Sequence, residues 1–247
     1  MLSGRYAGAP FGSVRAVSPD ESWIPEVQIT NPAGGMLGGD ALELDVSLAP
    51  GSSATLTTQG ATKAYSGEES SQTAEIRVGD GAFLEYLPHH LIPFSGSSHR
   101  QITRFMLHGE ATLLAWEAYS AGRLARGERF EFDRLSSSTG VHVDDAPVAT
   151  DGFELPGVYP PGYEHFGGYS YLATVFAVAP DAAGIAEDLH GLPRMEKGSL
   201  ASASAPSERL CISRMLTGSA PTLYRMLNLC RSAVRERLSI PAGREIW

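Results

Sequence analysis

The chain has few of the residues that mark a disulfide scaffold, a zinc site or a membrane protein. It holds two cysteines, Cys211 and Cys230, in 247 residues, too few for a disulfide framework or a four-thiolate zinc site. Its longest apolar run, LATVFAVA at 172–179, is far shorter than the ~20 residues that span a bilayer. The first residues, MLSGRYAGAPFGS, lack the apolar stretch of a signal peptide. These absences predict a cytoplasmic protein with no membrane partner.

Basic residues are also scarce. The chain has 19 Lys and Arg against 28 Asp and Glu, a net charge of −9. Because phosphate binding requires a basic face, this balance excludes nucleic acid as a main partner. A hydrophobic content of 43% and a charged content of 19% indicate a folded globular protein. The 27 glycines and 16 prolines favour many turns between short strands.

Sequence motifs of common catalytic and nucleotide sites are missing. There is no G-x-S-x-G and no H-E-x-x-H, so no catalytic set emerges from these motifs. The glycine-rich stretch NPAGGMLGGD (31–40) fails the dinucleotide pattern at Met36, and no Gly-Lys-Ser/Thr follows it. Its two glycine pairs instead predict sharp turns or close backbone approach. These glycines are Gly34, Gly35, Gly38 and Gly39.

What the first half does contain is an internal repeat. Three segments align without gaps, with shared alanines at steps of 28 and 29 residues, and each follows an alternating strand pattern. A further alternating run, ERFEFDRL (128–135), is expected to continue the series. Such a period predicts stacked β units that bury a continuous core; ordinary hairpins in a sandwich are the alternative. The aligned segments are LAPGSSATLTT (48–58), VGDGAFLEYLP (78–88) and LHGEATLLAWE (107–117).

The second half predicts strands at 169–178, 199–205 and 209–216 with two helices, at 181–190 and 219–238. Ser219 suits the N-cap and Pro221 the first turn of the second helix. One face of that helix is apolar and is expected to be core, with a buried free thiol at Cys230. The predicted fold class is therefore mainly β, with stacked strand repeats resembling a β-helix at 1–152. A small α+β part with two helices, 153–247, packs on it as one structural unit.

Polar residues follow the repeats at similar places. If the units stack, Asp40, Lys63, Glu85 and Glu117 are expected to converge. The adjacent histidines His89 and His90 point to opposite faces if the segment is extended, so both cannot easily bind one metal. They are expected to form a surface pair; the alternative is that one of them is a metal ligand together with an acid.

Five motifs in order resemble the UreD family of urease accessory proteins, called UreH in some organisms. They cover nearly the whole chain: NPAGGMLGGD, TTQGATKAY, LEYLPHHLIPF, LLAWEAYSAGRLARGERF and the terminal REIW. The resemblance implies a β-rich stack with two helices and a scaffold, not an enzyme. It implies binding to the urease apoprotein, to UreF and, through UreF, to the GTPase UreG. A dimer within that accessory complex is one arrangement that the resemblance allows.

The resemblance also implies that nickel passes through an internal tunnel, with no tightly bound cofactor. Asp40 takes the place of the acid in the glycine motif, Glu117 the acid after the tryptophan, and Asp151 an acid beyond the Asp-x-x-Pro turn. These three are the expected transient nickel ligands. The glycine pairs would keep side chains out of the tunnel, with Asp40 at its wall. The other motif residues around the path are Thr62, Lys63 and Glu85.

Two other functions stay open at this point. One is a β-solenoid hydrolase with Asp40 and Glu117 as paired acids, although three tryptophans, scattered at positions 23, 116 and 247, argue against an aromatic-lined sugar cleft. The other is a structural subunit of a protein complex that carries no metal.

Overall fold

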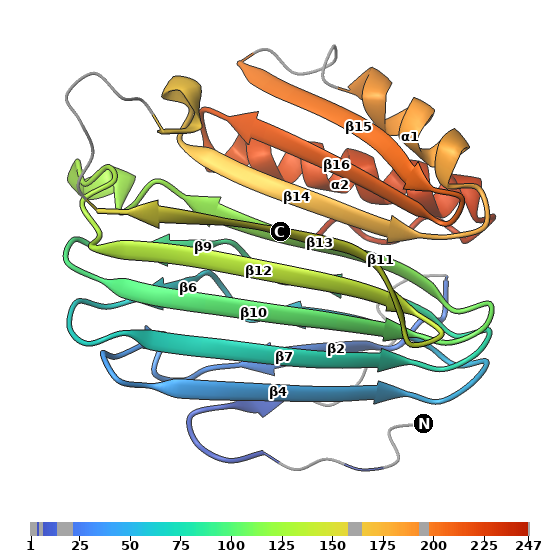
Figure 1. Ribbon diagram of the computed structural model, residues 1–247, viewed down its shortest axis with the longest axis horizontal. Helices are drawn as coiled ribbons and strands as arrows, with labels where there is room; N and C mark the ends of the chain where they lie inside the picture. Colours follow the sequence, from blue (N-terminus) through green and yellow to red (C-terminus); the bar gives the residue numbers. More distant parts are fainter. Residues whose placement is uncertain (1–3, 5–6, 14–21, 158–164, 193–197, 247) are drawn as a thin grey trace.

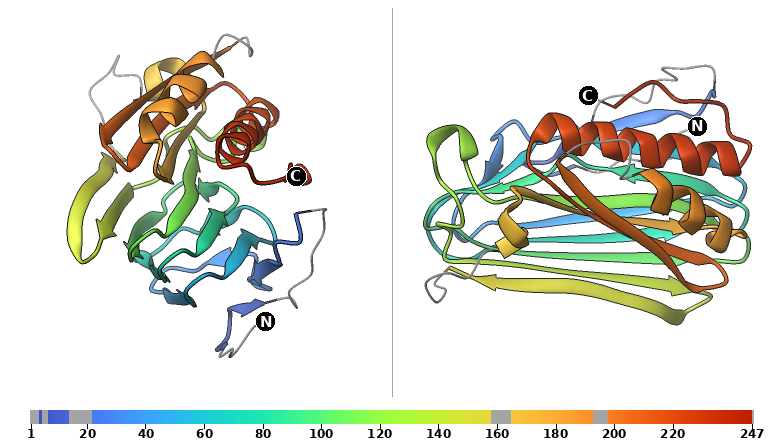
Figure 2. Two further views of the ribbon diagram at one scale, coloured as in Figure 1. Left: turned by 90° about the vertical axis from the view of Figure 1, so that its right-hand side faces the viewer. Right: turned by 90° about the horizontal axis from the view of Figure 1, so that it is seen from above.

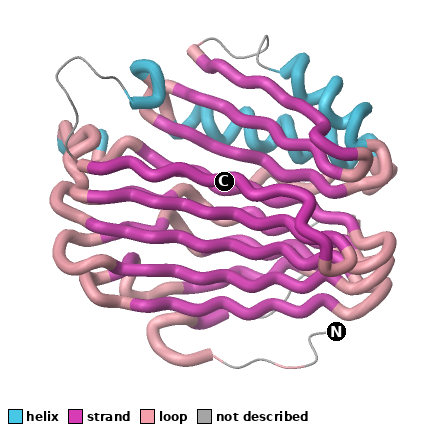
Figure 3. Tube along the Cα trace, in the orientation of Figure 1, coloured by secondary structure: helices cyan, strands magenta, loops and turns pink. Residues whose placement is uncertain are grey.

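The chain winds into a stack of β coils that carries two α-helices on one side (Figure 1). The computed structural model describes residues 4, 7–13, 22–157, 165–192 and 198–246. Within them, an eleven-stranded sheet faces a five-stranded sheet, and Figure 3 shows strands dominating the molecule. The predicted fold class is confirmed. No helix in the described part is long and apolar enough to cross a membrane.

Successive coils contribute parallel strands to both sheets. The larger sheet stacks β2 (Glu26–Thr30), β5 (Ser53–Thr58), β8 (Phe83–Leu87) and β11 (Thr112–Ser120). The smaller sheet stacks β4 (Ala41–Leu48), β7 (Ser70–Val78), β10 (Ser98–Leu107) and β12 (Arg134–Val143). A third strip holds β3 (Gly35–Met36), β6 (Thr62–Ala64) and β9 (Leu91–Pro93). Antiparallel strands β1 (Gly12–Ser13) and β13 (Ala146–Pro156) join β2 and β12.

The repeat is real, but its first step is longer than predicted. Ser53 pairs with Phe83, and Phe83 pairs with Thr112, so the steps are 30 and 29 residues. The ungapped alignment was two residues short at the first step. Because side chains alternate along a strand with a period of two, a shift of two leaves every side chain on its predicted face.

The strand expected at 128–135 is wrong. The strand that continues the series is β12, which begins at Arg134. Phe130 has φ +55°, and Phe132 is buried beside Tyr119 and Leu135. The alternating phenylalanines therefore reflect two rings inserted into the core from an irregular loop. That loop follows the 3-10 helix η1 (Leu124–Arg126).

The C-terminal part continues the larger sheet. Its order, β14 (Tyr171–Val178), α1 (Ala182–Gly191), β15 (Ser199–Ser207), β16 (Leu210–Thr217) and α2 (Ala220–Arg237), is the predicted one, preceded by the 3-10 helix η2 (His165–Gly168). β14 pairs with β11, so the sheet runs without a break from the coils into this part. Both helices lie on the same face of it (Figure 2). The division of the chain at residue 152 stays a prediction.

Helix ends follow the sequence signals. Ser219 accepts a hydrogen bond from the backbone N–H of Thr222 at 3.3 Å, and Asp181 accepts one from Gly184 at 3.0 Å. These caps satisfy donors that the first turn leaves unpaired. Cys230 is a buried free thiol, as predicted, and Cys211 is another.

Strand β11 separates two hydrophobic cores. Leu113 and Ala115 face the interior of the coils, and Leu114 and Trp116 face the helices. A strand buried on both faces reads as a continuous apolar run, and this explains the segment TLLAWEA. The same alternation decides which polar side chains enter the coil interior.

We expect the substitution Leu227→Ala to lower the free energy of unfolding by about 2 to 5 kcal/mol, as truncation of a buried leucine does. Leu227 is 1% exposed and lies in the core beneath α2. Urea denaturation measures the change. Leu200→Ala is the matched control, because Leu200 is 58% exposed and its loss should be small. A loss below about 1 kcal/mol for Leu227→Ala would mean that this helix face is not core.

Candidate functional site

A cavity of about 470 Å³ lies among the coils. Inward-facing side chains of several strands line it, so residues far apart in the sequence lie around one cavity. Among the described residues that line it, Glu117 is the one acid and Lys63 the one lysine or arginine. Its polar lining includes Thr62, Lys63, Gln72, His89, Gln101 and Glu117.

Glu117 is a buried carboxylate surrounded by neutral donors. It is 4% exposed. One oxygen accepts from Thr103 Oγ1 at 2.5 Å and from Gln101 Nε2 at 3.4 Å. The other accepts from Tyr119 OH at 2.9 Å and from Ser137 Oγ at 3.0 Å.

Within the described part of the chain, Glu117 forms no ion pair. Burial, reinforced by the nearby charge of Glu117, raises the pKa of Tyr119 well above its usual range. A buried negative charge that lacks a cationic partner favours the approach of a cation.

The conformation of the loop at residues 31–40 explains why it contains two glycine pairs. Gly34 and Gly39 have φ +70° and +84°, a backbone region that strongly favours glycine. A Cβ on Gly35 would collide with the backbone oxygen of Lys63, and one on Gly38 would lie 2.6 Å from the amide of Glu68. Each pair therefore combines one left-handed residue with one close approach to the next coil. Gly34 and Gly35 also line the cavity.

Asp40 ends this loop. Its Oδ2 accepts from the backbone N–H of Leu37 at 2.8 Å, so it closes the turn before β4. Asp40 lies outside the described lining of the cavity, whereas Thr62 and Lys63 belong to it. The expected convergence therefore joins Lys63 with Glu117 at one cavity.

Glu85 does not join them, so this part of the expected convergence is wrong. Its neighbours Leu84 and Tyr86 face the coil interior, and alternation turns Glu85 to the opposite face, toward α2. The side chain is fully buried.

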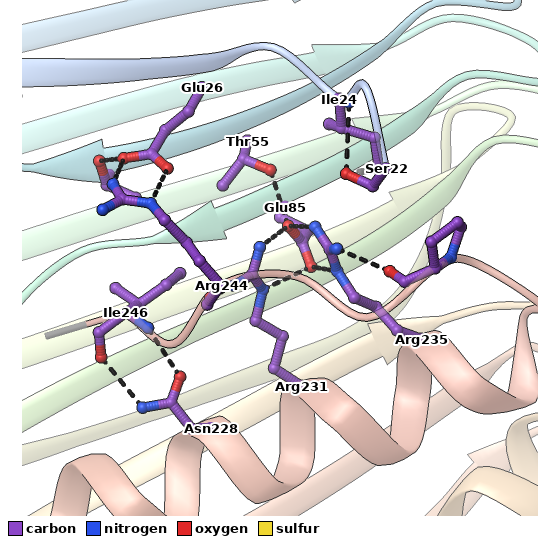
Figure 4. Close-up of polar contacts among 12 residues, drawn as sticks. Ser22, Ile24, Glu26, Thr55, Glu85, Asn228, Arg231, Arg235, Arg244 and Ile246 are labelled. Carbon is purple, nitrogen blue, oxygen red and sulfur yellow. Dashed lines mark hydrogen bonds and ion pairs between the residues drawn. The ribbon is translucent and has the colours of Figure 1, made fainter. Parts of the chain in front are cut away.

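Two arginines of α2 bind the carboxylate of Glu85 (Figure 4). Arg231 Nε and Nη2 donate at 2.9 and 2.8 Å, and Arg235 Nε and Nη2 both donate at 2.7 Å. Thr55 Oγ1 also donates, at 2.7 Å. This cluster fixes α2 on the stack.

The same arginines hold the segment after α2. Arg231 donates to the backbone oxygen of Arg244 at 2.7 Å, and Arg235 to that of Pro241 at 2.9 Å. Asn228 both donates to the carbonyl and accepts from the N–H of Ile246, each at 3.0 Å. The segment is thereby fastened across the helix.

The family model described as UreD urease accessory protein matches residues 1–247. The chain belongs to the UreD family. The resemblance carried by the five motifs is thus confirmed, and the fastened segment contains the terminal motif REIW up to Ile246.

Curated relatives carry the same name. Urease accessory protein UreD of Anaeromyxobacter sp. (strain Fw109-5) is 42% identical over 179 residues, 71% of this chain and 57% of that protein. UreD 2 of Brucella anthropi is 34% identical over 162 residues, with shares of 65% and 59%. UreD of Pseudomonas putida (strain W619) is 36% identical over 172 residues, with shares of 69% and 61%. The chain thus spans less than two thirds of the length of these UreD relatives.

Asp151, the third acid expected from the UreD resemblance, lies on β13. It forms an ion pair with Arg214 of β16, which links the smaller sheet to the C-terminal strands. It is not among the described residues lining the cavity.

His90 is buried, contrary to the predicted surface pair, and His89 is half-buried. His90 is 8% exposed, and its Nδ1 hydrogen-bonds with Tyr224 OH at 2.6 Å. Both imidazole rings contact the ring of Tyr224. Residues 88–90 form a loop, so strand alternation does not separate the rings. Burial lowers the pKa of His89 and of His90 to about 4, which keeps both neutral at neutral pH.

Several site residues of this UreD-family chain were missed from the sequence. Gln101, Thr103 and Ser137 occupy inward positions of β10 and β12, where polar residues break the apolar alternation. That break is the signal that could have found them. Arg231 and Arg235 continue the buried stripe of α2 in steps of four from Leu227. No three His, Cys, Asp or Glu side chains gather as a metal site in the described residues.

We expect Glu85→Gln to lower the free energy of unfolding at pH 7 by about 3 to 5 kcal/mol, because it leaves two buried arginines without their carboxylate. Burial alone raises the pKa of Glu85, but hydrogen bonds from Arg235 and Arg231 outweigh it and lower the pKa to about 2. This contribution is therefore complete above the ordinary value of 4.5 and is lost as the pH falls toward 2.

Urea denaturation of both proteins across that pH range measures the difference. Glu154→Gln is the control, because it removes an exposed ion pair with Arg134 and should leave the transition unchanged at every pH. A Glu85→Gln deficit that stays constant between pH 5 and 2.5 would contradict this assignment.

Proposed function

We propose that this chain is a cytoplasmic scaffold of urease maturation. It binds the urease apoprotein together with UreF and, through UreF, the GTPase UreG. The support is a family match along 247 residues and the printed name of the relatives, urease accessory protein. The chain acts without catalysing a reaction and without a tightly bound cofactor. Its net charge of −9 is unsuited to nucleic acid.

The cargo of this scaffold is nickel, which travels through the cavity among the coils. The observation that carries this proposal is Glu117, a buried carboxylate whose four hydrogen bonds all come from neutral groups. A cation that enters a passage of low dielectric loses hydration, and a fixed carboxylate replaces part of it. Nickel accepts carboxylate and imidazole ligands, and His89 belongs to the same lining. A site with only these two ligands holds nickel weakly, which suits its transport better than its storage.

Asp40 and Asp151 are proposed as transient nickel ligands of lesser importance than Glu117. Asp40 closes a loop whose Gly34 and Gly35 line the cavity, which suits a place near an entrance. The charge of Asp151 is already paired with Arg214. The proposed order of importance is therefore Glu117, then Asp40, then Asp151.

A glycosidase-like hydrolase fits less well. That chemistry needs two carboxyl groups on either side of the scissile bond. The described lining supplies only Glu117, while Asp40 is engaged by the amide of Leu37. The nickel content of urease distinguishes the proposed nickel path from a structural subunit that carries no metal.

We expect Glu117→Gln to slow urease activation about tenfold, an increase of roughly 1.4 kcal/mol in the barrier to nickel transfer. The substitution keeps size and removes charge, and the hydroxyls of Thr103, Tyr119 and Ser137 can reorient toward the amide. Asp40→Asn should have a smaller effect. Nickel content of purified urease and co-purification with UreF and UreG are the measurements.

Glu75→Gln serves as the control, because Glu75 pairs with arginines on the outer face of the stack. Unchanged activation by both acid variants would mean that these acids do not handle nickel. Loss of UreF binding by both would mean that their role is structural.

A further inference from the structure

His99 is a fully buried histidine in the interior of the stack. It lies on β10, the middle strand of the smaller sheet (Figure 1), and is 0% exposed. Phe105 and Leu107 of the same strand face the coil interior, and alternation turns His99 to the same side. Within the described part of the chain, its Nε2 atom has no hydrogen-bond partner. Because buried polar atoms are almost always hydrogen-bonded, this exception calls for an explanation.

Ser70 determines which ring nitrogen of His99 carries the proton. Ser70 is the register neighbour of His99 on β7, and its Oγ lies 3.0 Å from His99 Nδ1. The same hydroxyl donates to the backbone oxygen of Ser98 at 3.3 Å. A hydroxyl has only one proton to donate, so Ser70 Oγ accepts its other bond from Nδ1–H. Nε2 is therefore the unprotonated nitrogen, and its lone pair is unshared.

An imidazole in this state has the form that binds a metal ion. A histidine ligand is neutral, and its other ring N–H is usually held by a protein acceptor that orients the ring. Burial lowers the pKa of His99 to about 4, although a contact with the Gln101 side chain opposes the shift. The ring therefore stays neutral at neutral pH. Its tautomer and its orientation by Ser70 are those of a ligand.

Gln101 lies between this ring and Glu117. It is the next inward residue of β10, roughly 7 Å from His99 along the strand, and it lines the cavity. Its Nε2 donates to Glu117 at 3.4 Å, the longest of the four hydrogen bonds that this carboxylate accepts. Since a hydrogen bond of this length is weak, the Gln101 side chain can rotate while the three hydroxyl groups continue to hold Glu117. That rotation would open the way from the cavity to His99.

A second buried atom without a partner lies on the far side of His99. Ser97 is 0% exposed, and among the described residues its Oγ accepts and donates no hydrogen bond. Two residues apart on an extended segment, Ser97 and His99 face the same side. One imidazole and one hydroxyl, with no acid, would hold a divalent cation weakly, which suits an ion in transit.

We propose that His99 is a further ligand on the cation path, which continues from Glu117 past Gln101 to His99 Nε2 and Ser97 Oγ. This rests on the proposed function, because Glu117 must receive nickel first. Ser70 acts as the positioning residue that keeps Nε2 unprotonated. Magnesium and calcium prefer oxygen ligands, whereas imidazole suits nickel. His99 therefore selects for nickel at a point of the path where a second acid would accept any divalent cation.

The wild-type chain provides the first test, with histidine labelled by ¹⁵N. Long-range ¹H–¹⁵N spectra without metal should show His99 protonated at Nδ1 alone, with the signal assigned through its loss in His99→Gln. Zn²⁺, a diamagnetic ion that also accepts imidazole, stands in for nickel. Its addition should shift the Nε2 resonance of His99 and the side-chain amide of Gln101. Mg²⁺ at the same concentration should leave His99 unchanged. A ring protonated at Nε2 would overturn the proposal.

Ser70→Ala separates a metal ligand from a histidine that only fills the core. It removes the acceptor that fixes the tautomer, so the His99 site should bind Zn²⁺ about tenfold more weakly, as after other losses of a group that orients a ligand. The response of Gln101 should stay as in the wild type. Ser71→Ala is the matched control, because Ser71 lies on the opposite face of β7 and should bind Zn²⁺ normally. Wild-type affinity in Ser70→Ala would contradict the role of His99.

His99→Gln tests the same step with the complete set of accessory proteins. The nickel content of purified urease should fall several-fold, while His108→Gln, which changes an exposed histidine, should leave it unchanged. If His99→Gln unfolds by circular dichroism, the Ser70→Ala titration decides instead. A Zn²⁺ response at Gln101 without one at His99 would overturn this inference and leave the function of Glu117 standing. No response at either residue would overturn both.

Discussion

The buried carboxylate of Glu85 is the interaction on which the arrangement of the two halves depends. Three charged side chains leave water together, and burial of such groups is tolerated only when nearly all of their hydrogen-bonding capacity is used. Here one carboxylate receives four bonds from Arg231 and Arg235, and each guanidinium also donates to the segment after α2. Because a guanidinium group binds a carboxylate in a fixed planar geometry, these bonds determine how α2 is rotated about its axis and how far it lies from the coils. The helix, the terminal segment and strand β8 are therefore positioned as a unit.

Strand alternation separates this structural cluster from the functional one. Glu85 and Glu117 lie on neighbouring strands of the same sheet, but they face opposite sides of it. On the helix side, Arg231 and Arg235 both pair with Glu85, so the charge of this acid is neutralised within the fold. The coil side supplies only neutral donors for Glu117. Among the described residues its charge has no cationic partner, and this difference is the reason that we propose the coil interior as the path of the metal.

Much of the fold could be read from the sequence, because it is encoded locally. The repeat, both helices and their caps depend on residues a few positions apart, and a two-residue error in the step did not change which side chains face inward. The loop at 128–135 misled because Phe130 and Phe132 alternate for reasons of tertiary packing. The site was harder to predict. Alternation tells which face of the sheet each acid takes, but the partners on that face come from distant segments. Those of Glu117 include Gln101, Thr103 and Ser137 on other strands.

In the part of the chain that the structure describes, the apolar interior is covered differently at the two ends of the stack. At one end, β11 continues into β14 and the helices, and β12 is covered by β13. The apolar rows of these last coils are consequently sealed. At the other end, the row on β4 is half-open and its edge acidic. Among the described residues, the apolar interior is therefore fully covered at the helix end and only half-covered along β4.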